Sequence, residues 1–234
     1  MKSIIKCSGL SASYDGNPVL EGLSFNVNEG DYLCILGENG SGKSTLVKCL
    51  LGIKPLDSGN IVFADKLTYR DIGYLPQHTD MQKGFPATVR EIVISGCLGR
   101  RGLRPFYSAA EKKTADDAMK RLGITELADK SCRELSGGQQ QRMLLARAMC
   151  AAKKMLLLDE PVTGLDPSAM NDMYGLIDEL NKKDKMTIIM VTHDVSNALK
   201  YSNRILCLCS CSESFCGTPG EYEASHLNIK NSGD

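Results

Sequence analysis

The residues best suited to chemistry form a glycine-rich run that reads Gly37-Glu38-Asn39-Gly40-Ser41-Gly42-Lys43-Ser44-Thr45. Glycines let consecutive backbone N–H groups turn toward one anion, and the start of a following helix adds the positive end of its dipole. The Lys43 ammonium can reach the β- and γ-phosphates of a nucleotide, and the Ser44 hydroxyl is a ligand for Mg²⁺. The run lies between an expected strand and an expected helix, the context that a phosphate-binding loop (P-loop) requires. We therefore expect a nucleotide site at Gly37, Asn39, Gly40, Ser41, Gly42, Lys43, Ser44 and Thr45.

A pair of carboxylates follows an apolar run over residues 155–158. In an open parallel sheet, ligands bind beyond the carboxyl ends of the strands, so Asp159 and Glu160 should face the glycine-rich loop. Asp159 would hold Mg²⁺ through water, and Glu160 would polarise the attacking water as general base. An acidic pair after a strand is also common as a helix cap or turn. The phosphate-binding loop favours the catalytic interpretation.

A second glycine-containing turn, Leu135-Ser136-Gly137-Gly138-Gln139, stands at the start of another expected helix. It is therefore a second candidate for binding an anion. A chain with one nucleotide fold does not need two such helix starts for a single ATP. We expect phosphate contacts at Ser136, Gly137, Gly138 and Gln139.

With these three motifs the chain resembles ATPases of the ABC transporter class, and residues 135–139 match the signature sequence of that family. The resemblance runs from Ile4 to Pro219 and implies ATP and Mg²⁺ as cofactors. It also implies that Ser136 and Gly138 act across a head-to-tail homodimer, on the γ-phosphate of ATP held by the other copy.

Four further positions match the family in order, although Tyr14 taken alone would be a hairpin surface residue and His193 a turn histidine. Tyr14 matches the aromatic ring that stacks on adenine, and Gln77 matches the glutamine that senses Mg²⁺ and water. Asp166 belongs to a turn that crosses to the other subunit, and His193 matches the histidine that contacts the γ-phosphate. The resemblance thus implies catalytic roles for Glu160, His193 and Gln77, and Mg²⁺ contacts for Ser44, Gln77 and Asp159.

The elements that must position these residues follow from hydrophobic periodicity and turn residues. Strands are expected over 4–13, 19–27, 31–36, 61–63, 72–75, 155–158, 186–191 and 204–208, with the strands at 61–63 and 72–75 as a pair. Helices are expected over 43–51, 139–151 and 167–182. This alternation predicts the α/β class: a P-loop NTPase (RecA-like) core with a mainly parallel sheet and an N-terminal antiparallel β subdomain.

An inserted helical subdomain is expected at 81–134, where Thr88 with Glu91 and Ser108 with Glu111 form capping boxes. The whole chain, 1–234, would then be one ABC ATPase domain. Residues 1–80 and 135–219 would form the nucleotide-binding core, and 220–234 a flexible tail.

Composition limits the alternatives. Basic and acidic residues number 28 each, which counts against nucleic acid as a partner. The N-terminus lacks a signal peptide and no apolar run reaches the length of a membrane span, so we expect a cytoplasmic protein, peripheral on the inner face of the cell membrane. The ten cysteines should be reduced. We interpret Cys207, Cys209, Cys211 and Cys216 as small buried hydrophobes and not as a metal site, because the first three alternate along one strand face without the paired spacing of structural zinc sites.

The segment 84–93 resembles importers of zinc, manganese and similar metal ions, in which it receives the membrane permease subunits. We therefore expect permease docking around 77–94, a substrate-binding protein as a further partner, and import of zinc or manganese. The basic stretch 100–107 could join that interface or be a solvated loop. Importers of siderophores or cobalamin, and a soluble ABC ATPase such as an iron–sulfur assembly subunit, are the alternatives. Plain P-loop kinases and GTPases do not explain the second turn.

Overall fold

The computed structural model describes residues 2–64, 66–77, 86–101, 104–209 and 214–231. The chain divides into two units, one formed by Met1–Tyr69 with Lys185–Asp234 and the other by Arg70–Asp184. The expected residues Gly84 and Phe85 of the metal-importer segment, two residues of the basic stretch and Cys211 lie outside the described residues.

The first unit contains an antiparallel sheet of three strands in the order β2-β1-β4. They are β1 (Ser3–Tyr14), β2 (Asn17–Asn28) and β4 (Ser58–Phe63). The expected N-terminal hairpin is confirmed. The expected pair at 61–63 and 72–75 is wrong, because β4 pairs with β1 whereas β5 (Ile72–Leu75) pairs in parallel with β6 (Met155–Asp159). Both strands were recognisable from their own residues, but pairing depends on distant segments of the chain.

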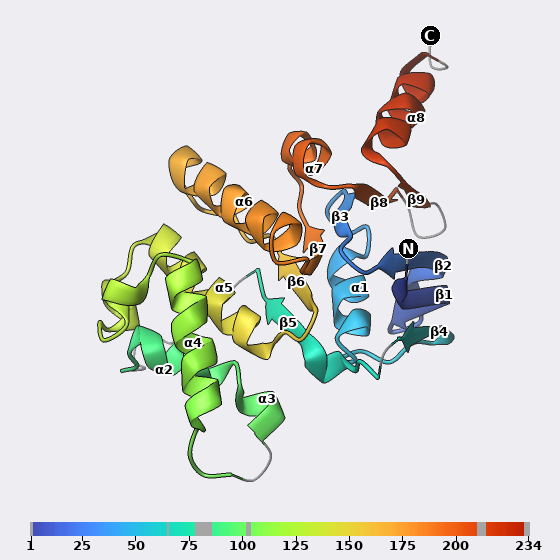
Figure 1. The fold of residues 1–234 in the computed structure, drawn as a ribbon. Helices are drawn as coiled ribbons and strands as arrows, with labels where there is room; N and C mark the ends of the chain where they lie inside the picture. The colour runs from blue at the N-terminus through green and yellow to red at the C-terminus, as the bar shows by residue number, and fades with distance from the viewer. Residues whose placement is uncertain (1, 65, 78–85, 102–103, 210–213, 232–234) are drawn as a thin grey trace. The chain divides into compact units, whose positions relative to one another are not determined.

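A parallel group of strands completes the first unit, with β7 (Thr187–Val191) and β8 (Arg204–Leu208) on either side of β3 (Tyr32–Gly37). Every residue of β7 and nearly every residue of β3 is buried, as expected of strands covered on both faces. The short strand β9 (Ser214–Gly217) runs antiparallel to β8. Figure 1 shows α1 (Lys43–Leu50), α7 (Val195–Tyr201) and α8 (Pro219–Asn231) in this unit.

The second unit combines β5 and β6 with helices. The long helix α5 (Gly137–Ala151) packs against β5, and its approach is so close that a Cβ on Gly73 would lie 2.2 Å from the Ala148 carbonyl oxygen. α2 (Val89–Ser95) and α4 (Ala109–Arg121) pack against α5, as Figure 1 shows. The remaining helices are α3 (Leu98–Arg101) and α6 (Pro167–Lys182). The α/β class with a helical insertion is thus confirmed.

Both expected capping boxes are present in this insertion. The Thr88 hydroxyl accepts from the Glu91 backbone N–H, and the Glu91 carboxylate accepts in return from the Thr88 backbone. Ser108 and Glu111 do the same at the start of α4. These hydrogen bonds to the ionised form lower the pKa of both glutamates.

A flexible tail was expected from residue 220, and the structure has the helix α8 at Pro219–Asn231. Thr218 precedes the helix, and its backbone N–H donates to the Glu221 carboxylate at 2.7 Å. Its Tyr222 is 6% exposed and packs near Phe215, with ring centroids 5.6 Å apart. Among the described residues, no helix combines the length and apolar character needed to cross a membrane.

Candidate nucleotide-binding site

The glycine-rich run forms the loop between β3 and α1, and its backbone has conformations that other residues rarely adopt. Gly37, at the end of β3, has φ 147°, and Gly42, just before α1, has φ 96°. A Cβ on Gly37 would lie 2.5 Å from the Ser41 hydroxyl oxygen, and one on Gly42 would lie 2.9 Å from the Val19 carbonyl oxygen. The loop therefore requires glycine at both positions for space as well as for φ.

The polar groups of this loop fit a phosphate. The Lys43 ammonium folds back and donates to the carbonyl oxygens of Gly37 at 2.7 Å and Glu38 at 2.6 Å. Gly42 provides no side-chain cap for the N-terminus of α1. The Ser41 hydroxyl is buried and has no hydrogen-bond partner among the described residues. A buried hydroxyl is costly to leave unpaired, so its position is explained best by a ligand with oxygen atoms.

Three more expected residues belong to the same unit. Ser44 is exposed one residue inside α1, while Thr45 is buried. Tyr14 ends β1 with 43% of its surface exposed, and the Lys54 ammonium lies 4.0 Å from the centre of its ring. A half-exposed aromatic ring at a strand end can stack on a flat ligand.

His193 is exposed beyond the carboxyl end of β7. Because β7 runs parallel to β3 with Val191 opposite Ile35, this histidine and the phosphate loop leave the sheet at the same edge. The Thr192 backbone N–H donates to the Ile35 carbonyl at 3.2 Å and holds the two strand ends together. His193 and the phosphate loop therefore lie at one edge of the sheet, and the γ-phosphate contact of His193 stays a prediction.

The carboxylates of the second unit form a cluster at the end of β6. Gln77 donates from its side-chain amide to the Glu160 carboxylate at 2.7 Å, although the two residues are 83 positions apart. Glu160 has φ 49°, a conformation that is uncommon outside glycine and that recurs in strained functional positions. The structure therefore brings the expected catalytic pair Gln77 and Glu160 together.

Two neighbours of this cluster were not expected from the sequence. The Thr163 hydroxyl donates to the same Glu160 oxygen at 3.0 Å. Tyr74, on β5, hydrogen-bonds to Asp159, which is 7% exposed. Burial, and next the negative charge of Asp159, raise the pKa of Tyr74 to about 12. The spacing Glu160-x-x-Thr163 and the parallel register of Tyr74 with Leu157, two residues before Asp159, were the signals that could have found them.

Each unit offers oxygen atoms of the kind that Mg²⁺ binds. A hard divalent cation prefers carboxylate, hydroxyl and amide oxygens, and it keeps several waters of its own. The second unit has the Asp159 carboxylate and the Gln77 amide, and the first unit has the Ser44 hydroxyl. Among the described residues, no group of three or more His, Cys, Asp or Glu side chains could hold a metal ion by itself.

The second turn begins α5 with its own side chains as caps. The Ser136 hydroxyl accepts from the Gln139 backbone N–H at 3.4 Å, and the Gln139 amide oxygen accepts from the Ser136 backbone N–H at 3.0 Å. Ser136 and Gly137 are exposed. A Cβ on Gly137 would lie 3.7 Å from Leu165, and one on Gly138 would lie 3.3 Å from Ala169. The turn containing Asp166 therefore lies beside this helix start.

Asp166 is the N-cap of α6. One oxygen of its carboxylate accepts from the backbone N–H groups of Ser168 at 3.0 Å and Ala169 at 3.1 Å. Gly164 precedes it with φ 79°. Within this chain Asp166 therefore shapes the turn between Glu160 and α6.

The cysteine interpretation is correct for some positions and wrong for others. Cys207 is buried, as are the six scattered cysteines, and burial raises the pKa of Cys7 and Cys34 to about 12. Cys209 and Cys216 are exposed and do not act as buried hydrophobes. Cys209 follows the last residue of β8. Cys216 is on β9, which pairs with β8 at the end of the strand order.

This α/β chain contains a phosphate-binding loop, a carboxylate cluster after a buried strand and a second helix-capping turn. Together these features define a nucleotide-hydrolysing domain of the P-loop class. A family model described as ABC transporter matches residues 20–163. The chain belongs to the ABC transporter family and is an ATP-binding domain of that family. Membership implies binding and hydrolysis of ATP in the service of a transporter.

Two bacterial relatives match over most of their length. The chain is 38% identical over 212 residues to the zinc uptake system ATP-binding protein ZurA of Listeria monocytogenes, which covers 88% of this chain and 82% of the relative. It is 37% identical over 208 residues to the manganese transport system ATP-binding protein MntB of Bacillus subtilis, covering 87% and 82%. A solved inward-facing transporter of the metal-chelate type aligns with TM-score 0.85 and 30% identity, covering 94% of this chain and 85% of that one.

Proposed function

We propose that this chain is the ATP-hydrolysing subunit of an importer for a transition-metal ion, zinc or manganese. The observation that carries the proposal is the similarity to the zinc and manganese subunits, which covers almost nine-tenths of the chain. The subunit is peripheral on the inner face of the cell membrane and works with permease subunits and a substrate-binding protein.

The alternative cargo is a chelated metal, a siderophore or cobalamin. The specific observation in its favour is the likeness to the metal-chelate type transporter, whose identity of 30% is lower than that of the two ion-transport relatives. The motor residues are the same under both alternatives, because the cargo binds to the other subunits.

Cellular accumulation separates these two cargoes. The gene is deleted, the cells are starved of zinc, manganese and iron in turn, and uptake of each ion is measured. Loss of zinc or manganese accumulation, restored by the intact gene but not by Glu160→Gln, supports the proposal. Unchanged ion accumulation together with lost uptake of cobalamin or a siderophore would move the cargo to the chelate class.

In the proposed mechanism the phosphate loop holds the nucleotide. Backbone N–H groups of the loop, the Lys43 ammonium and the Ser41 hydroxyl bind the β- and γ-phosphates, and Tyr14 stacks on the base. Lys43 already donates to two loop carbonyls, which leaves its third N–H for a phosphate oxygen. Mg²⁺, when bound, neutralises phosphate charge, and Ser44, Asp159 and Gln77 are its proposed protein contacts.

Glu160 accepts the proton of the attacking water. Its carboxylate receives hydrogen bonds from the Gln77 amide and the Thr163 hydroxyl on the same oxygen, Oε2. These two donors fix the orientation of the carboxylate, which must be directed at the water that it deprotonates. His193 contacts the γ-phosphate and helps to position it for in-line attack.

The second turn acts on a different nucleotide. Within its own chain, Ser136 already serves as the cap of α5, yet it is exposed together with Gly137. We propose that Ser136, Gly138 and Gln139 contact the γ-phosphate of ATP bound to another copy, with Asp166 beside them. The resulting head-to-tail homodimer holds two ATP molecules.

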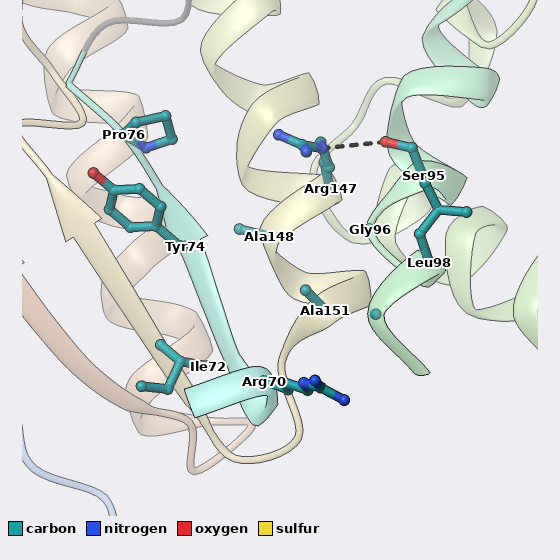
Figure 2. Close-up of a pocket in the computed structure, with 11 residues that line it drawn as sticks. Arg70, Ile72, Tyr74, Pro76, Ser95, Gly96, Leu98, Arg147, Ala148 and Ala151 are labelled. Carbon is teal, nitrogen blue, oxygen red and sulfur yellow. Dashed lines mark hydrogen bonds between the residues drawn. The ribbon is translucent and has the colours of Figure 1, made fainter. Parts of the chain in front are cut away.

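The permease contact proposed here is a cavity of about 340 Å³ in the second unit. Figure 2 shows its wall between β5, α5 and the end of α2, with the Arg147 side chain donating to the Ser95 hydroxyl at 3.1 Å. Arg70 and Leu98 also line it. The cavity lies next to Pro76, directly before the catalytic Gln77, so a helix seated here would be sensitive to the state of the nucleotide site.

Charge reversal tests this contact. Arg147→Glu should lower the ATPase stimulation by permease while the affinity of the isolated chain for ATP is unchanged. Lys183→Glu, which removes an exposed ion pair with Glu179 on α6 and lies outside the expected docking segments, is the control for a general effect of surface charge. Equal stimulation of Arg147→Glu and the parent protein would place the permease elsewhere.

A further inference from the structure

The end of β8 carries two thiols that the proposed ATPase mechanism does not use. The sulfur atoms of Cys207 and Cys209 lie 3.7 Å apart. Cys207 is 7% exposed, whereas Cys209 is exposed. Both are free thiols. Residues two positions apart in an extended segment share one face, and their Cα separation of about 6.6 Å is within the range that a disulfide spans.

This thiol pair is adjacent to the start of the phosphate loop. β8 pairs with β3 so that Cys207 is opposite Leu36 and Leu208 is opposite Gly37. The Leu208 carbonyl oxygen lies 2.6 Å from the point that a Cβ on Gly37 would occupy. No spare volume therefore separates the residue between the two thiols from the first glycine of the loop.

The surroundings of the two thiols assign them different roles. Burial raises the pKa of Cys207 to about 11, although the Lys43 charge and a hydrogen bond from the Tyr222 hydroxyl act in the opposite direction. Cys209 is open to solvent and can meet a soluble oxidant. An exposed thiol that reacts first and a second thiol that resolves the product is the usual arrangement of an oxidisable pair.

We propose that Cys207 and Cys209 form a peroxide-sensitive site whose disulfide slows ATP turnover at the neighbouring phosphate loop. The regulatory part rests on the proposed ATPase function. The disulfide joins the residues on either side of Leu208 and strains the Leu208 backbone. Because the Leu208 carbonyl has no spare room beside Gly37, a displacement in that direction shifts Gly37, the start of the loop that binds phosphate.

The chemistry balances with one peroxide molecule. The Cys209 thiolate attacks the O–O bond, an S–O bond forms, and the departing hydroxide takes a proton to give water. The Cys207 sulfur then attacks the sulfenic acid; the S–S bond forms, the S–O bond breaks, and the second hydroxide leaves as water with the Cys207 proton. Two thiols lose two electrons in total, and peroxide is reduced to two waters.

Cys216 provides a matched control inside the chain. It is exposed on β9 opposite Leu206, whereas Cys207 is opposite Phe215, so Cys216 and Cys207 are on opposite faces of the sheet. Its sulfur accepts from the Arg204 guanidinium at 3.2 Å. Loss of this thiol should therefore leave the proposed response to peroxide intact.

The bond is tested by mass spectrometry of the full chain reconstituted with its permease. Cys211 is replaced by serine, so that a proteolytic peptide covering 205–213 contains only the two proposed thiols. After treatment with hydrogen peroxide and blocking of free thiols, this peptide should be two hydrogen atoms lighter than the reduced peptide and should carry no blocking group. Dithiothreitol should restore the mass of the reduced peptide. Absence of the bond in this peptide overturns the proposal.

Regulation is tested on the same samples. ATP hydrolysis should fall several-fold on oxidation and recover on reduction, in the parent and in Cys216→Ser, but not in Cys209→Ser. Affinity for a fluorescent ATP analogue is measured in parallel. If the reduced complex does not hydrolyse ATP, the ATPase proposal is contradicted, but the effect of the disulfide on the phosphate loop can still be measured as a change in this affinity. Full hydrolysis and unchanged analogue affinity with the bond complete would overturn the regulatory role.

Discussion

Two glycine-containing turns begin helices in this molecule, and they differ in whether side chains cap the start of the helix. The turn before α1 has no side-chain cap, leaves the buried Ser41 hydroxyl without a partner among the described residues, and folds Lys43 back over its carbonyls. The turn before α5 is closed by a capping box of Ser136 and Gln139 and is exposed. The first is shaped for a ligand of its own chain, whereas the second is already stable and offers its outer surface.

The difference explains how one chain can need both turns. A loop with unsatisfied buried groups gains most from its nucleotide and should depend on it for stability. A self-capped, exposed turn is stable in water and does not need a phosphate from another copy in order to fold. Predictions about each turn therefore differ in what they should change: nucleotide affinity for the first, and assembly with turnover for the second.

The largest effect is expected for Glu160→Gln. The amide keeps the shape of the carboxylate but cannot accept the proton of water, so hydrolysis should fall by about 10²- to 10⁴-fold while ATP still binds. With hydrolysis blocked, the phosphate loop of one copy and the Ser136 turn of the other can hold the same ATP. Gel filtration with ATP should therefore show a dimer that is absent without ATP. Hydrolysis at the parent rate would remove Glu160 from its role.

Lys43→Ala should weaken nucleotide binding by about ten- to hundredfold, because it removes charge-assisted hydrogen bonds to phosphate. Ser136→Ala should leave the affinity of the isolated chain nearly unchanged and yet block dimer formation and turnover. Titration of each variant with a fluorescent nucleotide measures the contrast. Equal losses of affinity in both would contradict the assignment of Ser136 to a nucleotide on another copy.

Alanine at the two first glycines should sharpen the comparison further. Gly37→Ala places a Cβ within 2.6 Å of the Leu208 oxygen at φ 147°, and should cost about 1–3 kcal/mol of unfolding free energy together with ATP affinity. Gly137→Ala meets only Leu165 at 3.7 Å and should be neutral for folding. Denaturant unfolding measures both. A lower hydrolysis rate in a stable Gly137→Ala chain would then report on its contact with the other copy.

The smallest effect concerns the cap itself. Ser136→Ala should destabilise the chain by about 1 kcal/mol through loss of the N-cap. Ser108→Ala is the matched control, because it removes the same type of capping box from α4. Both should lower the unfolding free energy alike, and only Ser136→Ala should stop turnover. Loss of turnover in Ser108→Ala would show that destabilisation alone accounts for both.

The sequence predicted local features best. Thr88 and Ser108 were recognised as caps because the capping rule joins residues only three apart. Ser136 and Gln139 fit the same rule, but they were predicted only as phosphate contacts. The same rule applied to Thr218 and Glu221 would have predicted α8, which was missed. The partner strands of β4 and β5 were not predictable, because strand pairing is set by contacts far apart in the chain.

The candidate site divides in the same way. Family order identified Gln77, and the acidic pair after a buried strand identified Glu160. The hydrogen bond between them spans 83 positions and has no local signal. Thr163 hydrogen-bonds to Glu160 and is only three positions away, so its spacing was a local signal. Tyr74, which hydrogen-bonds to Asp159, required the strand register. The exposure of Cys209 and Cys216 depended on the last strand and its surroundings, and alternation along the sequence alone gave the wrong result.

Mixing two inactive variants tests the central claim most directly. Lys43→Ala retains Ser136, and Ser136→Ala retains Lys43, so a head-to-tail dimer of one copy of each contains one site with both residues intact. The two purified chains are combined with permease, and ATP hydrolysis is compared with that of each chain alone. The account predicts hydrolysis in the mixture well above the sum of the separate rates. Hydrolysis equal to that sum, with mixed dimers demonstrated in the sample, would contradict it.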